Sequence, residues 1–322
     1  MNEKKTKLRP ALDGAPWLIG PNPTDLGSLQ GAIRPGEPFK GQEPVDHHIW
    51  RDAHGDWRCW SCIRHTAVGR ILYGWKSRDL EASPWEATGV MMRRDQSYGE
   101  SLADRPDAVH PRSEWLQSPF VARDGARYYM FYGGECQDPT GRLLLSAICL
   151  ATSNDGIDFT RHVNPFGKSW VFMGPGEARD PCLITIGGTW LCYYSGAETG
   201  TCAPNKVYVR TSKDLVHWSG SREVHWGGSA GSAGYQCECP HVVYRKGYYY
   251  LFRTKDYWKG QTYVYRSADP FDFGIDNDKY LIGQIDVAAP EIVVDGEKEY
   301  ISSNKDLMRG VMLHRLKWVS DA

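Results

Sequence analysis

Residues 180–194, DPCLITIGGTWLCYY, consist of an apolar run, a turn with two glycines and a second run rich in aromatic residues. Short runs of this kind around a glycine-containing turn are typical of a β-hairpin. The arrangement recurs in segments that begin at Asp46 (DHHIWRDAHGDWRCW), Ser118 (SPFVARDGARYYMFY), Cys239 (CPHVVYRKGYYYLFR) and Ala289 (APEIVVDGEKEYIS). Four of the five segments carry proline in second place, so the stretch is one copy of a fivefold repeat.

A second element follows four of the hairpins. It is a strand-like run that ends in serine, then a turn that contains aspartate, then an aromatic residue, as in YGWKSRDLEASPW (73–85), LATSNDGIDF (150–159), VRTSKDLVHW (209–218) and YRSADPFDF (265–273). The hairpins start 72, 62, 59 and 50 residues apart, which is enough for a four-stranded antiparallel sheet in each repeat. We therefore predict an all-β fold, a five-bladed β-propeller with four-stranded antiparallel blades.

The last repeat is short, because only 33 residues follow Ala289. We expect a strand from segment 1–45, either PWLIG (16–20) or GAIRP (31–35), to close the ring by pairing with the last blade. The whole chain, residues 1–322, is then a single propeller domain. A β-sandwich, the alternative, does not predict a fivefold recurrence. Residues 79–113 are expected to form a surface loop at a pocket rim or an oligomer contact.

Charge and composition exclude several classes of protein. Lys and Arg number 38 and Asp and Glu 39, without long runs of either sign, which argues against nucleic acid or an anionic membrane as partner. The sequence contains neither an apolar run of membrane-spanning length nor a signal-peptide core, so we expect a cytoplasmic protein. Several of the nine cysteines are expected to be small buried hydrophobes, and CWSC (59–62) has no second ligand pair. We expect no metal and no cofactor.

The repeat predicts a ring of side chains. In a propeller the innermost strand of each blade lines the central channel, so equivalent positions near its start converge at one mouth. Those positions hold Asp46, Ser118, Asp180 after Arg179, Cys239 after Glu238, and Ala289. Three carboxylates are thereby expected around one pocket, and two suffice to hydrolyse a glycosidic bond.

The motifs ARDP, with Asp180, and ECP, with Glu238, resemble the RDP and EC motifs of the five-bladed propeller glycosidases of families 32 and 68. The ATS and RTSKDLVHW stretches are similar both to those enzymes and to their relatives in family 43, the arabinanases and β-xylosidases. The resemblance extends from about residue 46 to the end. It departs at VDHHIW, where His47 stands in place of the proline that follows the nucleophile of families 32 and 68.

The resemblance implies a role for each residue that matches a motif. Asp180 is the transition-state stabiliser, Arg179 binds substrate hydroxyls, Glu238 is the general acid/base, and Asp46 takes the place of the nucleophile. Glu238 lies one residue before the position aligned with Asp180, so its strand must bulge or twist to aim it inward. Further candidates for contact with substrate are Gln117, Ser118, His241, Trp50 and Arg253, with Trp115 and Tyr235 as sugar-stacking aromatics.

The leading functional hypothesis is a retaining, exo-acting glycoside hydrolase that acts on a small furanoside substrate, with a fructofuranoside as the first choice. One alternative is the inverting mechanism of the family 43 arabinan and xylan enzymes, in which Asp46 is a general base. The separation of the two carboxyl groups distinguishes the mechanisms, at about 5 Å for retention and about 6.5–9.5 Å for inversion. A transglycosylase or phosphorolytic relative and a sugar-binding propeller without catalysis are further alternatives.

Overall fold

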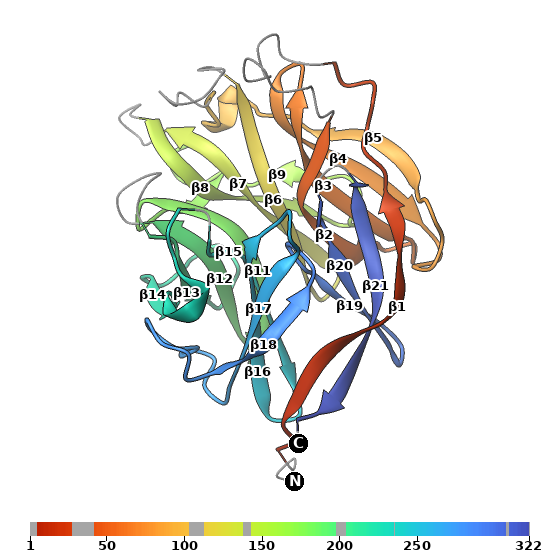
Figure 1. The fold of residues 1–322 in the computed structure, drawn as a ribbon. Coiled ribbons are helices and arrows are strands. Elements are labelled where there is room, and N and C mark those ends of the chain that lie inside the picture. Colours follow the sequence, from red (N-terminus) through yellow and green to blue (C-terminus); the bar gives the residue numbers. More distant parts are fainter. Residues whose placement is uncertain are drawn as a thin grey trace, which may run out of the picture.

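The computed structural model describes residues 5–27, 42–102, 113–137, 143–197, 204–234, 236–306 and 309–321. Apart from two short 3₁₀ turns, the regular structure of these residues is β-strand (Figure 1). The prediction of an all-β fold is confirmed. None of the described residues forms a helix long and apolar enough to cross a bilayer.

All five predicted hairpins are present, and each joins two antiparallel strands through a tight turn. The pairs are β2 (Glu43–Arg51) with β3 (Trp57–Thr66), β6 (Glu114–Asp124) with β7 (Arg127–Gln137), β11 (Glu177–Ile186) with β12 (Thr189–Ala197), β15 (Glu238–Arg245) with β16 (Tyr248–Asp256), and β19 (Ile292–Asp295) with β20 (Lys298–Ser303).

Further strands extend each hairpin into an antiparallel group. They are β4 (Gly69–Ser77) and β5 (Glu86–Met92), β8 (Leu143–Ser153) with β9 (Thr160–Arg161) and β10 (Trp170–Phe172), β13 (Lys206–Ser212) and β14 (Arg222–His225), β17 (Gln261–Ser267) and β18 (Leu281–Asp286), and β21 (Val311–Ser320) with β1 (Leu8–Gly20). A short parallel contact between β4 and β6 joins the first two groups into one nine-stranded sheet.

The serine and aspartate of the second predicted element form the same turn in four groups. The backbone N–H of the aspartate donates to the serine hydroxyl two residues earlier, in Asp79 to Ser77, Asp155 to Ser153, Asp214 to Ser212 and Asp269 to Ser267. Each aspartate then accepts from the backbone N–H two residues later. Local side-chain hydrogen bonds of this kind end a strand and fix the turn, which explains why the pair recurs in the sequence.

The N-terminal strand β1 pairs with the C-terminal strand β21 along its whole length, from Leu8 opposite Ser320 to Gly20 opposite Val311. PWLIG lies in β1, as one of the two predicted closing strands, whereas GAIRP lies outside the described residues. Ile19 of this strand is fully buried. It contributes to a core that combines the last group with the first, with members such as Tyr300 and Trp75.

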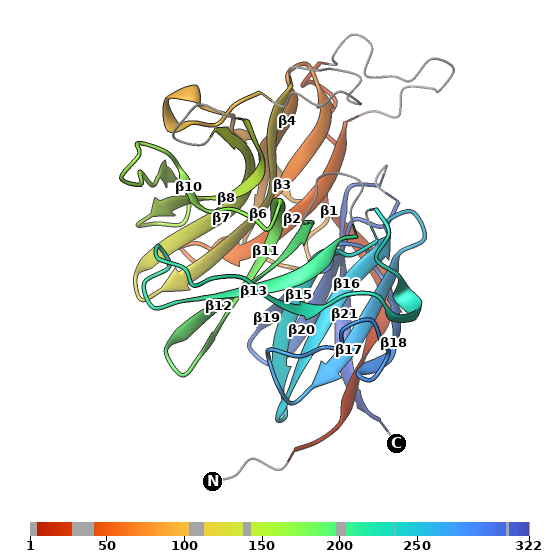
Figure 2. The same ribbon diagram turned by 90° about the vertical axis from the view of Figure 1, so that its left-hand side faces the viewer.

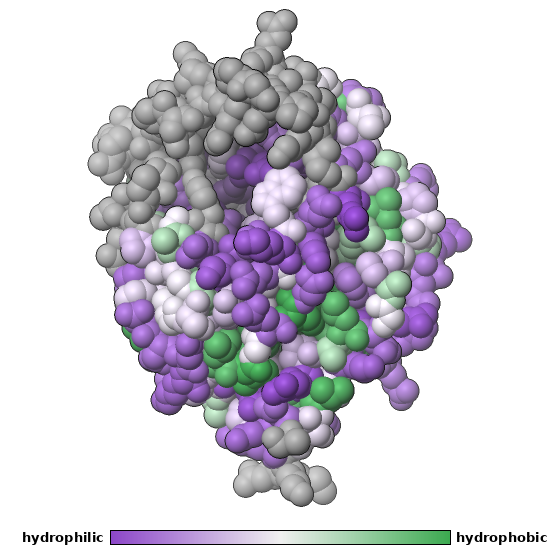
Figure 3. Space-filling view, in the orientation of Figure 1, coloured by the Kyte–Doolittle hydropathy of each residue, from purple (hydrophilic) through white to green (hydrophobic). Residues whose placement is uncertain are grey.

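Four further clusters of buried side chains lie between successive groups. The cluster between the second and third groups, for example, contains Phe131 of β7 and Tyr194 of β12. Each sheet is therefore buried on both faces by its neighbours, and Figures 1 and 2 show the sheets fanned around the inner strands β2, β6, β11, β15 and β19. On the face drawn in Figure 3, the hydrophobic side chains form small separate groups on a largely hydrophilic surface.

The prediction that residues 79–113 form a loop is wrong for part of this range. Glu86–Met92 is strand β5, which pairs with β4 and completes the first group. Its sequence, EATGVMM, contains glycine and mostly half-buried or exposed residues, so it lacks the apolar alternation that marks a strand. Residues 103–112 lie outside the described part of the chain.

Candidate active site

Five equivalent residues of the repeat adopt the same uncommon backbone conformation. Asp46, Ser118, Asp180, Cys239 and Ala289 have φ angles of 52°, 51°, 58°, 47° and 47°, in the left-handed region that non-glycine residues seldom occupy. In the first four groups this residue lies at a β-bulge of the inner strand. Strain of this type is concentrated at functional sites, where the surrounding structure enforces it.

The bulge explains how charged residues enter a strand. The sequence suggested that the inner strand opens on Arg179 and Asp180, but β11 begins earlier, at Glu177, so both residues lie inside the strand. The left-handed residue changes the direction of the chain, and consecutive side chains thereby reach the central hollow instead of alternating between two faces. Of the bulge or twist predicted beside Glu238, the structure shows a bulge, as a register shift between Glu238 and His241.

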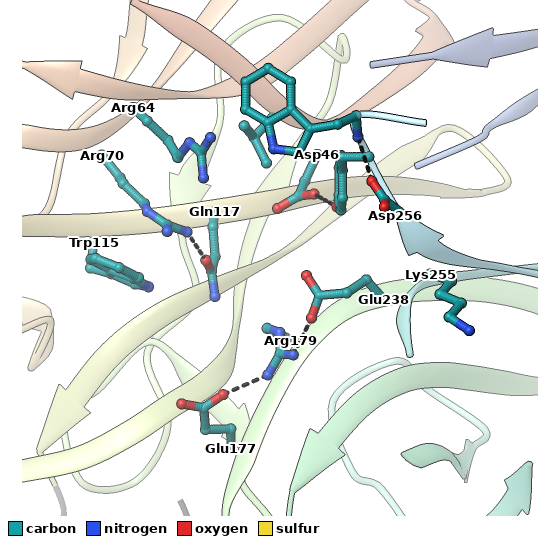
Figure 4. A pocket seen from close by; sticks show the side chains of 13 residues that line it. Asp46, Arg64, Arg70, Trp115, Gln117, Glu177, Arg179, Glu238, Lys255 and Asp256 are labelled. Atoms are coloured by element: carbon teal, nitrogen blue, oxygen red, sulfur yellow. Dashed lines mark hydrogen bonds and ion pairs between the residues drawn. The ribbon is translucent and has the colours of Figure 1, made fainter. Parts of the chain in front are cut away.

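A cavity of about 510 Å³ lies over the ends of the inner strands (Figure 4). The residue before the bulge lines it in four groups, namely Val45, Gln117, Arg179 and Glu238, and Asp46 lines it as well. Below it is a smaller hollow of about 20 Å³, with room for about one water molecule, which Asp46, Ser118, Asp180 and Cys239 share. The structure therefore brings Asp46, Asp180 and Glu238 together from three groups.

Asp46 and Asp180 are linked by the hydroxyl group of Ser118. Ser118 Oγ lies 3.1 Å from Asp46 Oδ2 and 2.6 Å from Asp180 Oδ1. The backbone N–H of Cys239 donates to Asp180 Oδ2 at 3.2 Å. Burial raises the pKa of Asp180, and the negative charge of Asp46 raises it further.

Asp46 is also held by two side chains of the fourth group. Tyr257 donates its hydroxyl hydrogen to Asp46 Oδ1 at 2.5 Å, and the thiol of Cys239 lies 3.1 Å from the same oxygen. Tyr257 follows β16 and is therefore contributed by the fourth group. Hydrogen bonds to both carboxylate oxygens fix the orientation of Asp46 toward the cavity.

Glu238 and Arg179 form a buried ion pair, and Arg179 also pairs with Glu177 at 2.5 Å. Burial raises the pKa of Glu238 to about 7, although Arg179 opposes the shift, and Asp180 and Asp46 add to it. A carboxyl group with this pKa is about half protonated at pH 7, so it can donate a proton there, as a general acid requires.

Three of the predicted substrate ligands line neither the cavity nor the small hollow, and Ser118 lines only the small hollow. Trp50 is buried in the core and donates its indole N–H to the Gly156 carbonyl oxygen at 2.9 Å. His241 is buried against Glu291, with 3.2 Å between Nδ1 and the carboxylate. Arg253 is fully buried and donates to the Gly231 carbonyl oxygen at 2.7 Å. These side chains support the walls of neighbouring groups.

Gln117 does line the cavity, and its side-chain oxygen accepts a hydrogen bond from Arg70 at 2.5 Å. Trp115 lines the cavity too, whereas Tyr235 lies outside the described residues. The sequence reasoning missed several lining residues, namely Arg64, Arg70, Glu177, Lys255, Asp256, Tyr257 and Trp258. Most lie in the second strand of a hairpin or just beyond it, where the repeat carried no signal.

Asp46, Asp180 and Cys239 have ligand atoms within 4.8 Å of one another, close enough for a cation. Their oxygen and sulfur atoms already form hydrogen bonds with Ser118 and Tyr257. A mixed set of two hard carboxylates and one soft thiolate is not typical of any one metal. We therefore derive no step through a metal.

The sequence profile of Glycosyl hydrolases family 43 matches residues 59–279. No curated protein shows a significant match. Among solved structures, the RS223 β-xylosidase is similar over 86% of this chain and 93% of its own, with 16% identity and a TM-score of 0.59. A family 43 enzyme from Xanthomonas citri, complexed with xylotriose, is similar over 87% of each chain, with 13% identity and a TM-score of 0.58.

The β-fructofuranosidase BmSUC1 of family 32 from Bombyx mori is similar over 96% of this chain and 62% of its own, with 16% identity and a TM-score of 0.58. Identities this low show a common fold and nothing about substrate. The fold shared with these enzymes is the β-propeller.

Proposed function

The chain belongs to the glycosyl hydrolases of family 43, and from this premise we propose that it releases a terminal pentosyl residue, xylosyl or arabinofuranosyl, from a small glycoside with inversion of configuration. The observation that carries the proposal is the position of Glu238 and Asp46 in one cavity, with the pKa of Glu238 raised to about 7. An acid with a pKa near neutral and a carboxylate held by hydrogen-bond donors are the two groups that the reaction needs.

Glu238 donates its proton to the oxygen of the leaving group. Asp46, oriented by Tyr257 and Ser118, accepts a proton from the attacking water molecule. The glycosidic bond breaks as the bond from water to the anomeric carbon forms, so the sugar leaves with inverted configuration.

Asp180 and Arg179 act beside these two groups. Asp180 adds to the pKa of Glu238 through its charge, and Arg179 opposes the shift through its ion pair with Glu238. The charge of Asp180 and the charge of Arg179 act in opposite directions on Glu238. Together they keep its pKa above its ordinary value but low enough for proton transfer.

We also propose that the five antiparallel groups are the blades of a five-bladed propeller that forms one domain. Two observations support a ring that β1 closes. β1 pairs with β21 in the last group, and the buried cluster that contains Ile19 is shared by the last group and the first.

A fructofuranoside is the second candidate substrate, with Asp46 as a nucleophile and retention of configuration. The RDP and EC motifs and the fold shared with the fructofuranosidase from Bombyx mori favour it. His47 in place of the expected proline argues for the first candidate.

The test is hydrolysis by the purified full chain of nitrophenyl xyloside, nitrophenyl arabinofuranoside and sucrose, with NMR detection of the first anomer released. We expect turnover of a pentoside and the inverted anomer. Retention with turnover of sucrose would favour the second candidate, and absence of turnover with every substrate would contradict both.

A further inference from the structure

Residues 255–258 form one wall of the cavity, at the end of β16 and just beyond it. The first of them, Lys255, follows Thr254, which pairs with Glu238 across the hairpin of β15 and β16. Lys255 is therefore the neighbour of the strand partner of the proposed general acid. Figure 4 shows Lys255 on the same side of the cavity as Glu238, with Arg70 on the other side.

The side chain of Lys255 lacks an internal counter-charge. Lys255 is half-buried, yet among the residues that the structure describes its ammonium group takes part in no ion pair and no hydrogen bond. Its Nζ atom lies 5.8 Å from the centre of the Tyr263 ring, close to the limit of a cation–π contact. The cavity wall thus carries a cation with only a weak contact to a neutral ring.

The carboxylates next to Lys255 are paired with other cations. Glu238, across the hairpin, pairs with Arg179. Asp256, the next residue along the chain, accepts a hydrogen bond from the backbone N–H of Lys259 and pairs with the Lys259 ammonium group at 3.4 Å. Lys255 can therefore bind a negatively charged group of a ligand without losing an internal partner.

The position of Lys255 relates it to the leaving group. A general acid lies beside the oxygen of the leaving group, whereas the base lies on the opposite face of the sugar ring. Because Lys255 adjoins Glu238, and Asp46 is contributed by the first group, the ammonium group is on the leaving-group side. We propose that Lys255 binds an oxyanion on the leaving group, so that the enzyme releases its pentosyl residue from an acidic aglycone. This inference deepens the proposed function and rests on it.

A lysine ammonium group is a compact charge with three donors on a flexible stem, and it binds carboxylates and phosphates alike. A carboxylate is the source that we test first. The substrates are two phenyl pentosides, one with a carboxylate at the meta position of the phenyl ring and the other with the methyl ester of that carboxylate. The measured quantity is the ratio of kcat/KM for the acid to kcat/KM for the ester, with the purified full chain.

This ratio should be at least about fivefold higher for the wild type than for Lys255→Met, because the variant loses a partly exposed ion pair with a hydrogen bond. Comparison of the same two substrates in both proteins cancels the difference in their leaving-group reactivity. Lys255→Arg should keep most of the ratio, since it keeps the charge. Lys255→Glu should lower the ratio below that of Lys255→Met, since it reverses the charge. Lys255→Met should fold, because no buried carboxylate loses its partner.

Lys279→Met is the matched control. Lys279 lies between β17 and β18 of the same group, 4.6 Å from the centre of the Tyr280 ring, but it is exposed and does not line the cavity. The ratio for Lys279→Met should equal that of the wild type.

A phenyl pentoside with a phosphate group at the same position is the second arm. A higher ratio for the phosphate than for the carboxylate, lost in Lys255→Met, would support the inference and identify a phosphate ester in place of a carboxylate. Equal ratios in the wild type and Lys255→Met for both anions, or an equal decrease in Lys279→Met, would overturn it. Turnover of nitrophenyl pentosides, lost in Glu238→Gln, tests the proposed function separately, so hydrolysis of acid and ester without any dependence on Lys255 would contradict this inference alone.

Discussion

The hydroxyl group of Ser118 lies 2.6 Å from the carboxylate of Asp180 and connects it to a second carboxylate, that of Asp46. A hydroxyl group has one hydrogen to donate. It can therefore donate to only one of the two carboxylates at a time. Burial raises the pKa of Asp180, and the negative charge of Asp46 raises it further.

The substitution Ser118→Ala should lower kcat/KM about tenfold, because a buried hydrogen bond to a charged group contributes roughly 1.5–3 kcal/mol. The expected cause is loss of orientation of Asp46, with the fold preserved. Ser212→Ala is a suitable control, since it removes a buried hydroxyl group far from the cavity. Equal activity of the two variants would contradict a linking role for Ser118.

The substitution Glu238→Gln should lower kcat/KM for a glycoside with a poor leaving group about 10²–10⁴-fold, as is usual for loss of a general acid. A dinitrophenyl glycoside needs little protonation of its leaving group, so its turnover should fall much less. Steady-state kinetics with both substrates measures this difference. A uniform loss would indicate that Glu238 does not act as the acid.

The pH dependence of kcat/KM should show a decrease as pH rises through about 7, because Glu238 loses its proton there. Burial is the main cause of the raised pKa, and the charge of Asp180 contributes to it. The substitution Asp180→Asn removes that charge, so the decrease in kcat/KM should occur at lower pH. A decrease at the same pH in Asp180→Asn and the wild type would show that the charge does not act on Glu238.

Ala289 offers a test of backbone strain separate from catalysis, because its φ angle is 47° and its side chain has no catalytic group. Ala289→Gly should change the free energy of unfolding by less than about 1 kcal/mol, since relief of strain offsets the added entropy of the unfolded chain. Ala289→Val should lower it by more than about 2 kcal/mol, because a β-branched residue resists this conformation. Urea unfolding measures both values, and equal stability of the two variants would exclude strain.

The contribution of the N-terminal strand can be measured at Ile19, which is fully buried between the last group and the first. Ile19→Ala should lower the free energy of unfolding by about 2–5 kcal/mol, the usual cost of a large-to-small change in a core. Val319→Ala on the partner strand β21, where the side chain is 37% exposed, should change it by less than about 1 kcal/mol. If Ile19→Ala lowers the free energy of unfolding no more than Val319→Ala does, β1 is dispensable for stability.

Regular local patterns explain what the sequence predicted well. The five hairpins and the Ser-Asp turns depend on alternation and on hydrogen bonds between residues two apart, so both are visible in the chain. Recurrence then aligned Asp46 with Asp180 and placed Glu238 one residue before the same position, and the structure brings these three together. Strand β5 was missed because an outer strand with glycine and exposed side chains carries no such pattern.

By itself, the sequence determined the repeat, the strand pairs and the carboxylates of the inner strands, because each follows from neighbours along the chain. Only the tertiary structure decided that Trp50, His241 and Arg253 are buried away from the cavity and that Tyr257, Arg64 and Arg70 line it. The physical reason is that a β-bulge reverses which face a side chain points to, and the packing of neighbouring sheets decides which face is hollow. The spacing of residues within one repeat predicts neither the bulge nor the packing of neighbouring sheets.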